Sequence, residues 1–101
     1  MSVLHVLSEA RDDVALIWAY LAEAQNAETA DRVARRIEKA YDQLTAFPES
    51  GRAREDIGPD ARSIAVRPYV IVYRIRPGIV EIMRVYHGAR NHRSLYIPPN
   101  P

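Results

Sequence analysis

The chain has 101 residues, 48% of them hydrophobic and 27% charged, with a formal net charge of +1. This length suits a single core, and we predict one domain over residues 1–101. The absence of cysteine excludes disulfides and thiolate metal sites. No apolar run is long enough for a membrane-spanning helix, and the first residues lack the features of a secretory signal, so we expect a cytoplasmic protein without membrane contact.

Charge is distributed unevenly along the sequence. Up to Pro48, five cations face eight acidic residues, whereas from Glu49 onward nine arginines face five acidic residues. Lys39 is the only lysine, so all the later cations are arginines, which suit bidentate contacts with phosphate or carboxylate. This asymmetry predicts that the functional surface lies in the C-terminal half.

The first quarter of the chain predicts a strand followed by a helix. Residues 3–7 are apolar and end at Ser8, whose side chain is a good N-cap for a helix over residues 8–24. Apolar residues recur in this helix at the i, i+3, i+4, i+7 spacing of an amphipathic helix, namely Val14, Ile17, Trp18 and Leu21. We therefore expect Trp18 to be a core residue.

A second helix is predicted over residues 28–46, capped by Asn26 or Thr29 and ended by Phe47-Pro48. The two helices form a helical hairpin because only a few residues join them. Apolar residues recur along the second helix at helical spacing, namely Ala30, Val33, Ile37, Ala40, Tyr41 and Leu44. Its other side has the mixed charge of a solvated face. Residues 49–60 carry glycine, proline and many charges without periodicity, which predicts an irregular loop.

Three strands are predicted in the remainder, over residues 62–66, 69–75 and 80–87, because β-branched and aromatic residues dominate these runs. Arg76-Pro77-Gly78 supplies the turn of an antiparallel hairpin between the last two. The predicted fold class is α+β in the order β-α-α-β-β-β, with the helical hairpin packed on one face of a small, mainly antiparallel sheet. We expect a mobile tail over residues 97–101, which is rich in proline.

Alternation along a strand predicts which side chains share a face of the sheet. In the last strand it places Val80, Ile82, Arg84 and Tyr86 on one face, and Glu81, Met83, Val85 and His87 on the other. Arginines accumulate on the strands and their exit, and one interpretation is a basic sheet face for a polyanion or an acidic partner protein. The alternative is a solvated face whose arginines pair with Glu81 and with acidic residues of the helices.

The sequence gives little support for a metal site or for a catalytic nucleophile. The three histidines, His5, His87 and His92, have no ligand-like spacing around acidic residues, and no serine stands in an elbow-like context. We expect neither a metal nor a cofactor.

The chain nevertheless resembles a known family over nearly its whole length. The motifs that carry the resemblance are Ile17-Trp18-x-Tyr20, Phe47-Pro48-x-x-Gly51-Arg52, Asp56-Ile57-x-Pro59-x-x-Arg62, Val70-Ile71-Val72-Tyr73-Arg74 and Glu81-Ile82-x-Arg84-Val85-x-His87-Gly88-Ala89-Arg90. In this order they are similar to the RelE/ParE toxin superfamily of bacterial type II toxin–antitoxin systems, and closest to its ParE-like branch.

For the RelE-like branch, the resemblance implies a metal-independent endoribonuclease that cleaves messenger RNA in the ribosome. Such chemistry needs an acid, a base and cations around the reacting phosphate. The residues that match this pattern are His87, Arg90 and Tyr96. The sequence departs from the pattern in the middle strands, where no lysine occurs and Val70 replaces an expected arginine.

For the ParE-like branch, the resemblance implies an inhibitor of DNA gyrase and not an enzyme, and the departures above favour this interpretation. Both branches imply a cognate antitoxin whose acidic segment folds on binding, and therefore a toxin–antitoxin hetero-oligomer. The residues expected to contact the target or the antitoxin are Arg62, Arg67, Arg74, Arg84, Arg90 and Arg93.

Overall fold

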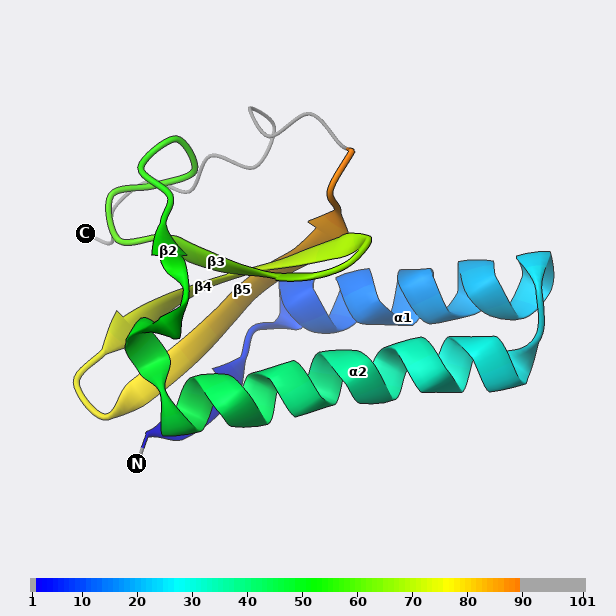
Figure 1. Cartoon of the computed structure of the whole chain (residues 1–101), viewed down its shortest axis with the longest axis horizontal. Helices are drawn as coiled ribbons and strands as arrows, with labels where there is room; N and C mark the ends of the chain where they lie inside the picture. The colour runs from blue at the N-terminus through cyan, green and yellow to red at the C-terminus, as the bar shows by residue number, and fades with distance from the viewer. Residues whose placement is uncertain (1, 90–101) are drawn as a thin grey trace.

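The structure, a computed structural model, describes residues 2–89. Two helices lie against the same face of a five-stranded sheet, and their hairpin extends past the edge of that sheet (Figure 1). The elements are β1 (Val3–Val6), α1 (Ser8–Ala24), α2 (Ala27–Ala46), the 3-10 turn η1 (Pro48–Ser50), β2 (Arg52–Ala53), β3 (Arg62–Val66), β4 (Tyr69–Arg76) and β5 (Ile79–His87). The predicted α+β class and element order are confirmed, with the short β2 as an addition. The expected tail over residues 97–101 lies outside the described residues.

The sheet has the strand order β1-β5-β4-β3-β2. β1 runs parallel to β5, while the other pairs are antiparallel, as expected for consecutive strands joined by short turns. Gly78 closes the β4–β5 turn with a φ of 72°, a conformation that glycine adopts without a steric penalty. β1 pairs only with Ile79 to Ile82, so the second half of β5 pairs with β4 on one side and has no strand on its β1 side among the described residues.

The helix boundaries follow the predicted capping at α2 but not at α1. The backbone N–H of Thr29 donates to the side-chain oxygen of Asn26 over 2.7 Å, which confirms Asn26 as the N-cap of α2. The prediction of Ser8 as an N-cap was wrong, because Ser8 is already helical and Leu7 occupies the cap position. The Ser8 hydroxyl instead donates to the side chain of Glu9.

The main core lies between the helices and the sheet. The apolar stripe predicted for α2 is confirmed, with Ile37 and Leu44 almost fully buried against Ile71 and Ile82. Trp18 was wrongly expected in the core: it is 38% exposed, and its indole N–H donates to Asp31 over 2.8 Å. It links the two helices at their solvent side, so the side chain is used as a hydrogen-bond donor between elements.

The opposite face of the sheet is not an open arginine face. The segment between β2 and β3 folds over it, and a second apolar cluster forms from Ile57, Ala61, Val72, Met83 and Tyr86. These side chains are buried, each no more than 5% exposed. The sequence does not show this cluster, because the segment that covers it looks like an irregular polar loop.

The strict alternation predicted for β5 fails at a register shift opposite Val72 and Tyr73. Tyr73 pairs with Ile82 while Val72 pairs with Arg84, so Met83 is an extra residue. Beyond this bulge the faces exchange. Val85 joins Ile82 in the main core, whereas Tyr86 joins Met83 in the second cluster.

The hydroxyl of Tyr73 organises the chain between α2 and β2. It donates to the carbonyl of Pro48 over 2.7 Å and accepts from the backbone N–H of Gly51 over 2.9 Å. A Cβ on Gly51 would collide with the Tyr73 ring and with the Ser63 carbonyl, which explains glycine at this position. The prediction that residues 49–60 are irregular was therefore wrong at β2 and η1, whose geometry depends on a side chain from a distant strand.

Candidate functional site

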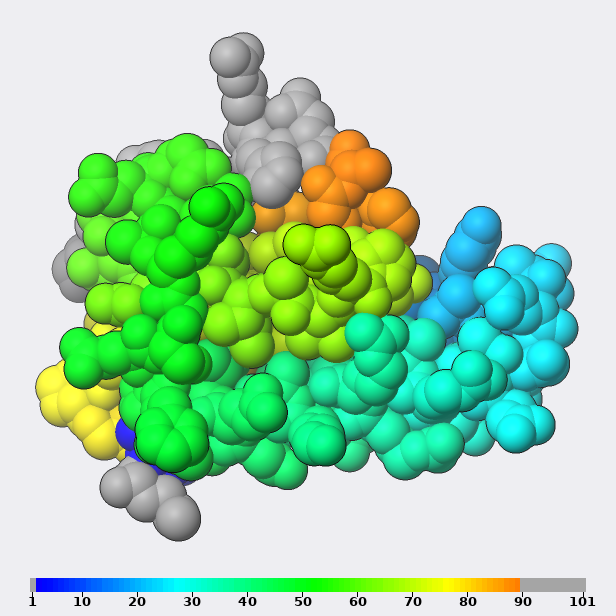
Figure 2. Space-filling view, viewed as in Figure 1, coloured from blue at the N-terminus to red at the C-terminus, as the bar shows by residue number. Residues whose placement is uncertain are grey.

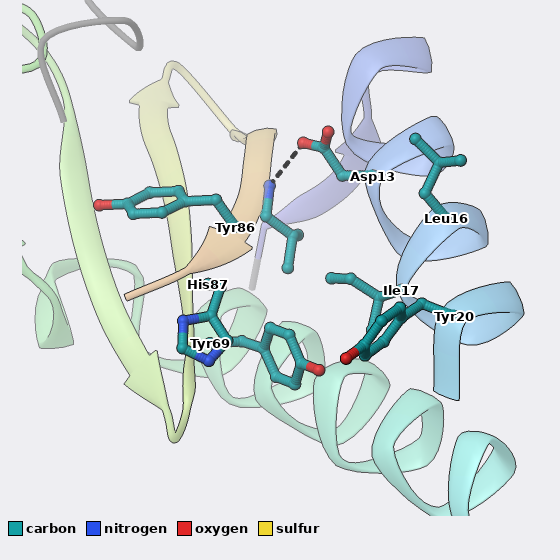
Figure 3. A pocket seen from close by; sticks show the side chains of 8 residues that line it. Asp13, Leu16, Ile17, Tyr20, Tyr69, Tyr86 and His87 are labelled. Atoms are coloured by element: carbon teal, nitrogen blue, oxygen red, sulfur yellow. Dashed lines mark hydrogen bonds between the residues drawn. The ribbon is translucent and has the colours of Figure 1, made fainter. Parts of the chain in front are cut away.

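A groove runs between α1 and the second half of β5, where β5 has β4 on one side and no strand on the other within residues 2–89. Its volume is about 390 Å³, and the residues that line it are Asp13, Leu16, Ile17, Tyr20, Tyr69, Val85, Tyr86 and His87. Figure 3 shows Ile17 and Tyr20 on the helix side, and Tyr69 and His87 facing them from the sheet. Tyr86 points away toward the other face of the sheet, so its side chain contributes little to the groove (Figure 3).

The helix side of the groove exposes an unusual amount of apolar surface. Leu16 and Tyr20 are 70% and 69% exposed, although both are large hydrophobic side chains. They are four residues apart and therefore neighbours on one side of α1. Sequence reasoning missed them because they lie off the stripe of buried residues, and that displacement is the signal that could have identified them. Exposed apolar side chains gathered beside a groove indicate an interaction site.

In this groove, Asp13 occupies a backbone N–H on the edge of β5 that has no strand beside it. Its carboxylate accepts a hydrogen bond of 2.9 Å from the backbone N–H of Val85 (Figure 3). The same carboxylate accepts two hydrogen bonds from the Arg84 guanidinium, of 2.8 and 3.0 Å. The hydrogen bond that Arg84 donates to Asp13 raises the pKa of Arg84, although partial burial acts against it. An N–H that is already occupied cannot pair with an incoming strand.

Tyr69 and His87 form the floor of the groove at the end of the sheet. Their rings meet edge to face, with centroids 5.8 Å apart. Burial raises the pKa of Tyr69, and Tyr20 adds to this effect, so the phenol stays neutral at physiological pH. The Nδ1 atom of His87 accepts from the backbone N–H of Ala89 over 3.2 Å. That hydrogen bond places the proton of a neutral His87 on Nε2.

Two of the predicted site arginines are held by carboxylates. Arg84 pairs with Asp13, and the Arg74 guanidinium donates to Glu81. Arg76 also approaches Glu81, at 3.3 Å, so one carboxylate serves two arginines. For these arginines, the structure matches the alternative of a face whose cations pair with Glu81 and with an acidic residue of a helix.

The other predicted arginines have different surroundings. Arg62 donates to the carbonyl of Gly51 over 2.7 Å and stabilises the turn into β2. Arg67 is exposed in the turn between β3 and β4, and its backbone carbonyl accepts from the Arg36 side chain over 2.8 Å. Arg90, Arg93 and Tyr96 lie outside the described residues.

Arg54 is a cation that sequence reasoning did not single out. It is only 7% exposed, and its guanidinium donates twice to Asp56 at 2.9 Å and once to the Ser63 hydroxyl at 3.1 Å. The hydrogen bond to Asp56 raises the pKa of Arg54 against the opposing effect of burial. Arg54 thus fixes the segment that covers the second apolar cluster.

Within residues 2–89, no three histidine, cysteine, aspartate or glutamate side chains are placed to hold a metal ion. In the same part of the chain, no helix combines the length and the apolar character needed to cross a membrane. The lining of the groove between α1 and β5 consists of three apolar side chains, three tyrosines, one histidine and Asp13.

Comparison with known proteins places this architecture in a family. Residues 4–92 match the family model of the ParE toxin of the type II toxin–antitoxin system, parDE. The chain belongs to the ParE toxin family. It is therefore a toxin of a type II toxin–antitoxin system, as the motifs in its sequence predicted.

Individual relatives of this ParE-family toxin have names from both branches of the superfamily. Toxin ParE3 of Caulobacter vibrioides is 32% identical over 79 residues, which cover 78% of this chain and 79% of that protein. Toxin RelE2 of the same organism is 39% identical over 61 residues, or 60% of this chain and 67% of that protein. Both relatives agree with the assignment to the RelE/ParE superfamily.

A solved structure described as the chromosomal ParDE TA system from P. aeruginosa has the same fold. The TM-score is 0.76, and the match covers 86% of this chain and 96% of that chain at 20% sequence identity. The similarity is therefore one of architecture, and it agrees with the two helices and mainly antiparallel sheet described above.

Proposed function

We propose that this ParE-family toxin acts in the cytoplasm as an inhibitor that binds DNA gyrase and blocks it on cleaved DNA. The observation that supports this proposal is the separation between His87 and Arg74, a middle-strand arginine that could replace the missing phosphate contact. Cleavage of RNA at a ribose 2′-hydroxyl needs an acid, a base and cations within reach of one phosphate. Among the described residues, His87 and Arg74 do not meet this requirement.

The register of the β4–β5 hairpin gives the distance between His87 and Arg74 along the sheet. His87 lies opposite Tyr69, while Arg74 lies opposite Glu81, five residues farther along β4. Five residues of an extended strand span about 17 Å, which is too far for two side chains to act on one phosphate. Arg74 is moreover paired with Glu81, and the Nδ1 atom of His87 accepts a backbone hydrogen bond.

The second candidate function is cleavage of messenger RNA in the ribosome, which the similarity to Toxin RelE2 favours. In that function His87, Arg90 and Tyr96 would be the catalytic residues. His87 presents its Nε2 atom at the exit of β5, from which the chain continues directly to Arg90.

Two assays on the same full-length toxin separate the candidates. We expect inhibition of gyrase supercoiling with accumulation of cleaved DNA, and intact messenger RNA in programmed ribosomes. Cleaved RNA with unaffected gyrase would establish the second function, and in that case Arg90→Ala and His87→Ala should abolish cleavage. Arg52→Ala, an exposed arginine in β2, is the control variant for both assays.

We further propose that a cognate antitoxin neutralises the toxin by placing an amphipathic helix in the groove between α1 and β5. Leu16 and Tyr20 provide exposed apolar surface beside that groove. Added strand pairing is disfavoured because Asp13 already occupies the N–H of Val85. A helix brings its own backbone hydrogen bonds and needs only an apolar surface on which to pack.

Tyr20→Ala tests the antitoxin site, and Phe47→Ala is its matched control. Both aromatic side chains are 69% exposed, but Phe47 lies after α2, away from the groove. We expect Tyr20→Ala to weaken antitoxin binding by about tenfold or more, as is usual for an aromatic hot spot. Phe47→Ala should leave the affinity unchanged in calorimetric titration. Equal affinities of both variants would place the antitoxin elsewhere.

A further inference from the structure

The solvent-facing side of α2 carries a basic stripe beside an acidic one. Its cations recur at i, i+3, i+4 and i+7, a spacing that keeps them on one side of a helix: Arg32, Arg35, Arg36 and Lys39. Its acidic residues Asp31, Glu38 and Asp42 follow an adjacent line, about 100° away around the helix axis, whereas Glu28 lies one turn before Arg32 on the basic line. The expected mixed charge of a solvated face is confirmed, because these residues are exposed. Packing against α1 and the sheet turns the acidic residues toward α1 and the cations toward β3.

Tertiary contacts show which neighbour each stripe faces. Asp31 accepts a hydrogen bond from Trp18 of α1, so the acidic stripe lies on the α1 flank. Arg36 donates to the backbone carbonyl of Arg67 after β3, so the basic stripe lies on the β3 flank. Figure 2 shows α2 and β3 side by side on one face of the molecule.

A shallow groove of about 560 Å³ separates α2 from β3 on that flank. Three cations line it, namely Arg36 and Lys39 from the helix and Arg67 from the turn after β3. All three are exposed, and none forms an ion pair with another residue of the range 2–89. They differ in this from Arg74 and Arg84, whose charges are neutralised by Glu81 and Asp13.

We propose that this α2–β3 groove binds the phosphate backbone of duplex DNA without sequence specificity. The basic stripe from Arg32 to Lys39 extends for about 10 Å along the helix axis, at about 1.5 Å per residue. Phosphates of one DNA strand rise by about 3.4 Å each along the duplex axis while the strand winds around it, so a stripe of this length can contact about two successive phosphates. Arginine forks and the lysine ammonium are the usual donors to phosphate oxygens.

The lining of the groove favours a duplex over a single strand. Besides the three cations, it consists of Ala40, Gln43, Ala65 and Val66, with no aromatic side chain. Binding of single-stranded nucleic acid generally depends on aromatic rings that stack on the bases. A surface of cations without such rings can contact only the backbone, which a duplex presents on its outside.

This site goes beyond the proposed function and does not rest on it. The α1–β5 groove and the α2–β3 groove share no lining residue. DNA binding at α2 can therefore hold or fail whether or not the toxin inhibits gyrase. Where both hold, the α2–β3 groove would keep the toxin beside the DNA that gyrase cleaves.

The test is a titration of the full-length toxin with a short fluorescent duplex of arbitrary sequence, followed by anisotropy at several salt concentrations. We expect binding whose logarithm falls linearly with the logarithm of the salt concentration. Lys39→Gln/Arg67→Gln removes two lining cations and should weaken binding by about tenfold or more, and lower the salt slope by about two units. Single-stranded RNA and an acidic peptide of equal charge serve as competitors.

The matched control is Arg11→Gln/Arg52→Gln, which removes two exposed cations outside the groove and changes the net charge equally. Its affinity and salt slope should stay close to those of the unmodified protein. Equal loss in both double variants would overturn the proposal, because net charge alone would then explain the binding. Tighter binding of the acidic peptide than of the duplex would overturn it in favour of a protein partner. The single variant Lys39→Gln, at an exposed helix position, repeats the test with the least risk to folding.

Discussion

The carboxylate of Asp13 and the guanidinium of Arg84 form a bidentate pair across 71 residues of sequence. Asp13 also accepts from the backbone N–H of Val85, so one side chain satisfies three donors. The pair lies where β5 has passed the end of β1 and has no further strand on that side in the described part of the chain. It therefore attaches α1 to the sheet at the wall of the candidate antitoxin groove.

Replacement of Asp13 should destabilise the protein strongly. Asp13→Ala leaves the partly buried Arg84 guanidinium and the Val85 N–H without their acceptor, so we expect a loss of about 3 kcal/mol in unfolding free energy. Urea denaturation measures this quantity. Asp12→Ala is the matched control, since Asp12 is exposed and makes no hydrogen bond or ion pair within residues 2–89, and should change stability by less than about 0.5 kcal/mol. Similar losses in the two variants would contradict the structural role of Asp13.

Removal of the hydroxyl group should have different effects on stability at two buried tyrosines. Tyr73→Phe breaks the hydrogen bonds with Pro48 and Gly51 and should cost about 1–3 kcal/mol. The Tyr41 hydroxyl is buried without a hydrogen-bond partner in the described residues, and burial raises the pKa of Tyr41 to about 12. Tyr41→Phe should therefore be neutral or stabilising. Thermal unfolding of both variants measures these changes in stability. A larger loss for Tyr41→Phe than for Tyr73→Phe would contradict the hydrogen bonding described for the two hydroxyl groups.

Glu81 should make the stability of the protein sensitive to acid. Burial tends to raise the pKa of Glu81, but hydrogen bonds from Arg74 and Arg76 outweigh it and hold the pKa below the ordinary value of 4.5. The unfolded chain therefore takes up this proton more readily than the folded one. The stabilisation is complete above the unfolded pKa and is lost as pH falls through 4.5 toward the lower folded pKa.

Glu81→Gln removes this titration and should flatten the fall in unfolding free energy below about pH 5. At neutral pH the variant should be less stable than the unmodified protein, and the difference should shrink on acidification. Denaturant unfolding at a series of pH values provides the measurement. Glu23→Gln, at an exposed position of α1 without an ion pair among the described residues, should leave the pH profile unchanged. A constant difference for Glu81→Gln across the pH range would show that the loss is not electrostatic.

Arg54 should control the segment that covers the second apolar cluster. Arg54→Met removes the donors to Asp56 and Ser63, so we expect a loss of about 3 kcal/mol. Hydrogen exchange should accelerate over residues 54–61 more than in the helices, because Arg54 holds this segment directly. Arg52→Met, two residues earlier and exposed, is the control and should exchange like the unmodified protein.

Much of the fold could be predicted from local patterns. The apolar stripe of α2, the Asn26 cap and the Gly78 turn were read correctly, since each depends on residues within a few positions of one another. The predictions that were wrong share another cause. The bulge at Met83, the strand β2 and the exposure of Trp18 all depend on partners far away in sequence. Of the predicted site residues, Arg74 and Arg84 proved to be paired, while Arg90, Arg93 and Tyr96 lie beyond the described residues.

The sequence by itself determined the α+β class, the order of the elements and the toxin family, because periodicity and short motifs are local properties of the chain. Only the tertiary structure decided which cations remain available. Arg74 and Arg84 are neutralised by Glu81 and Asp13, whereas Arg36, Lys39 and Arg67 come together in one groove without acidic partners in the described region. The physical reason is that a charge acts through its neighbours in space, and packing of remote elements selects those neighbours.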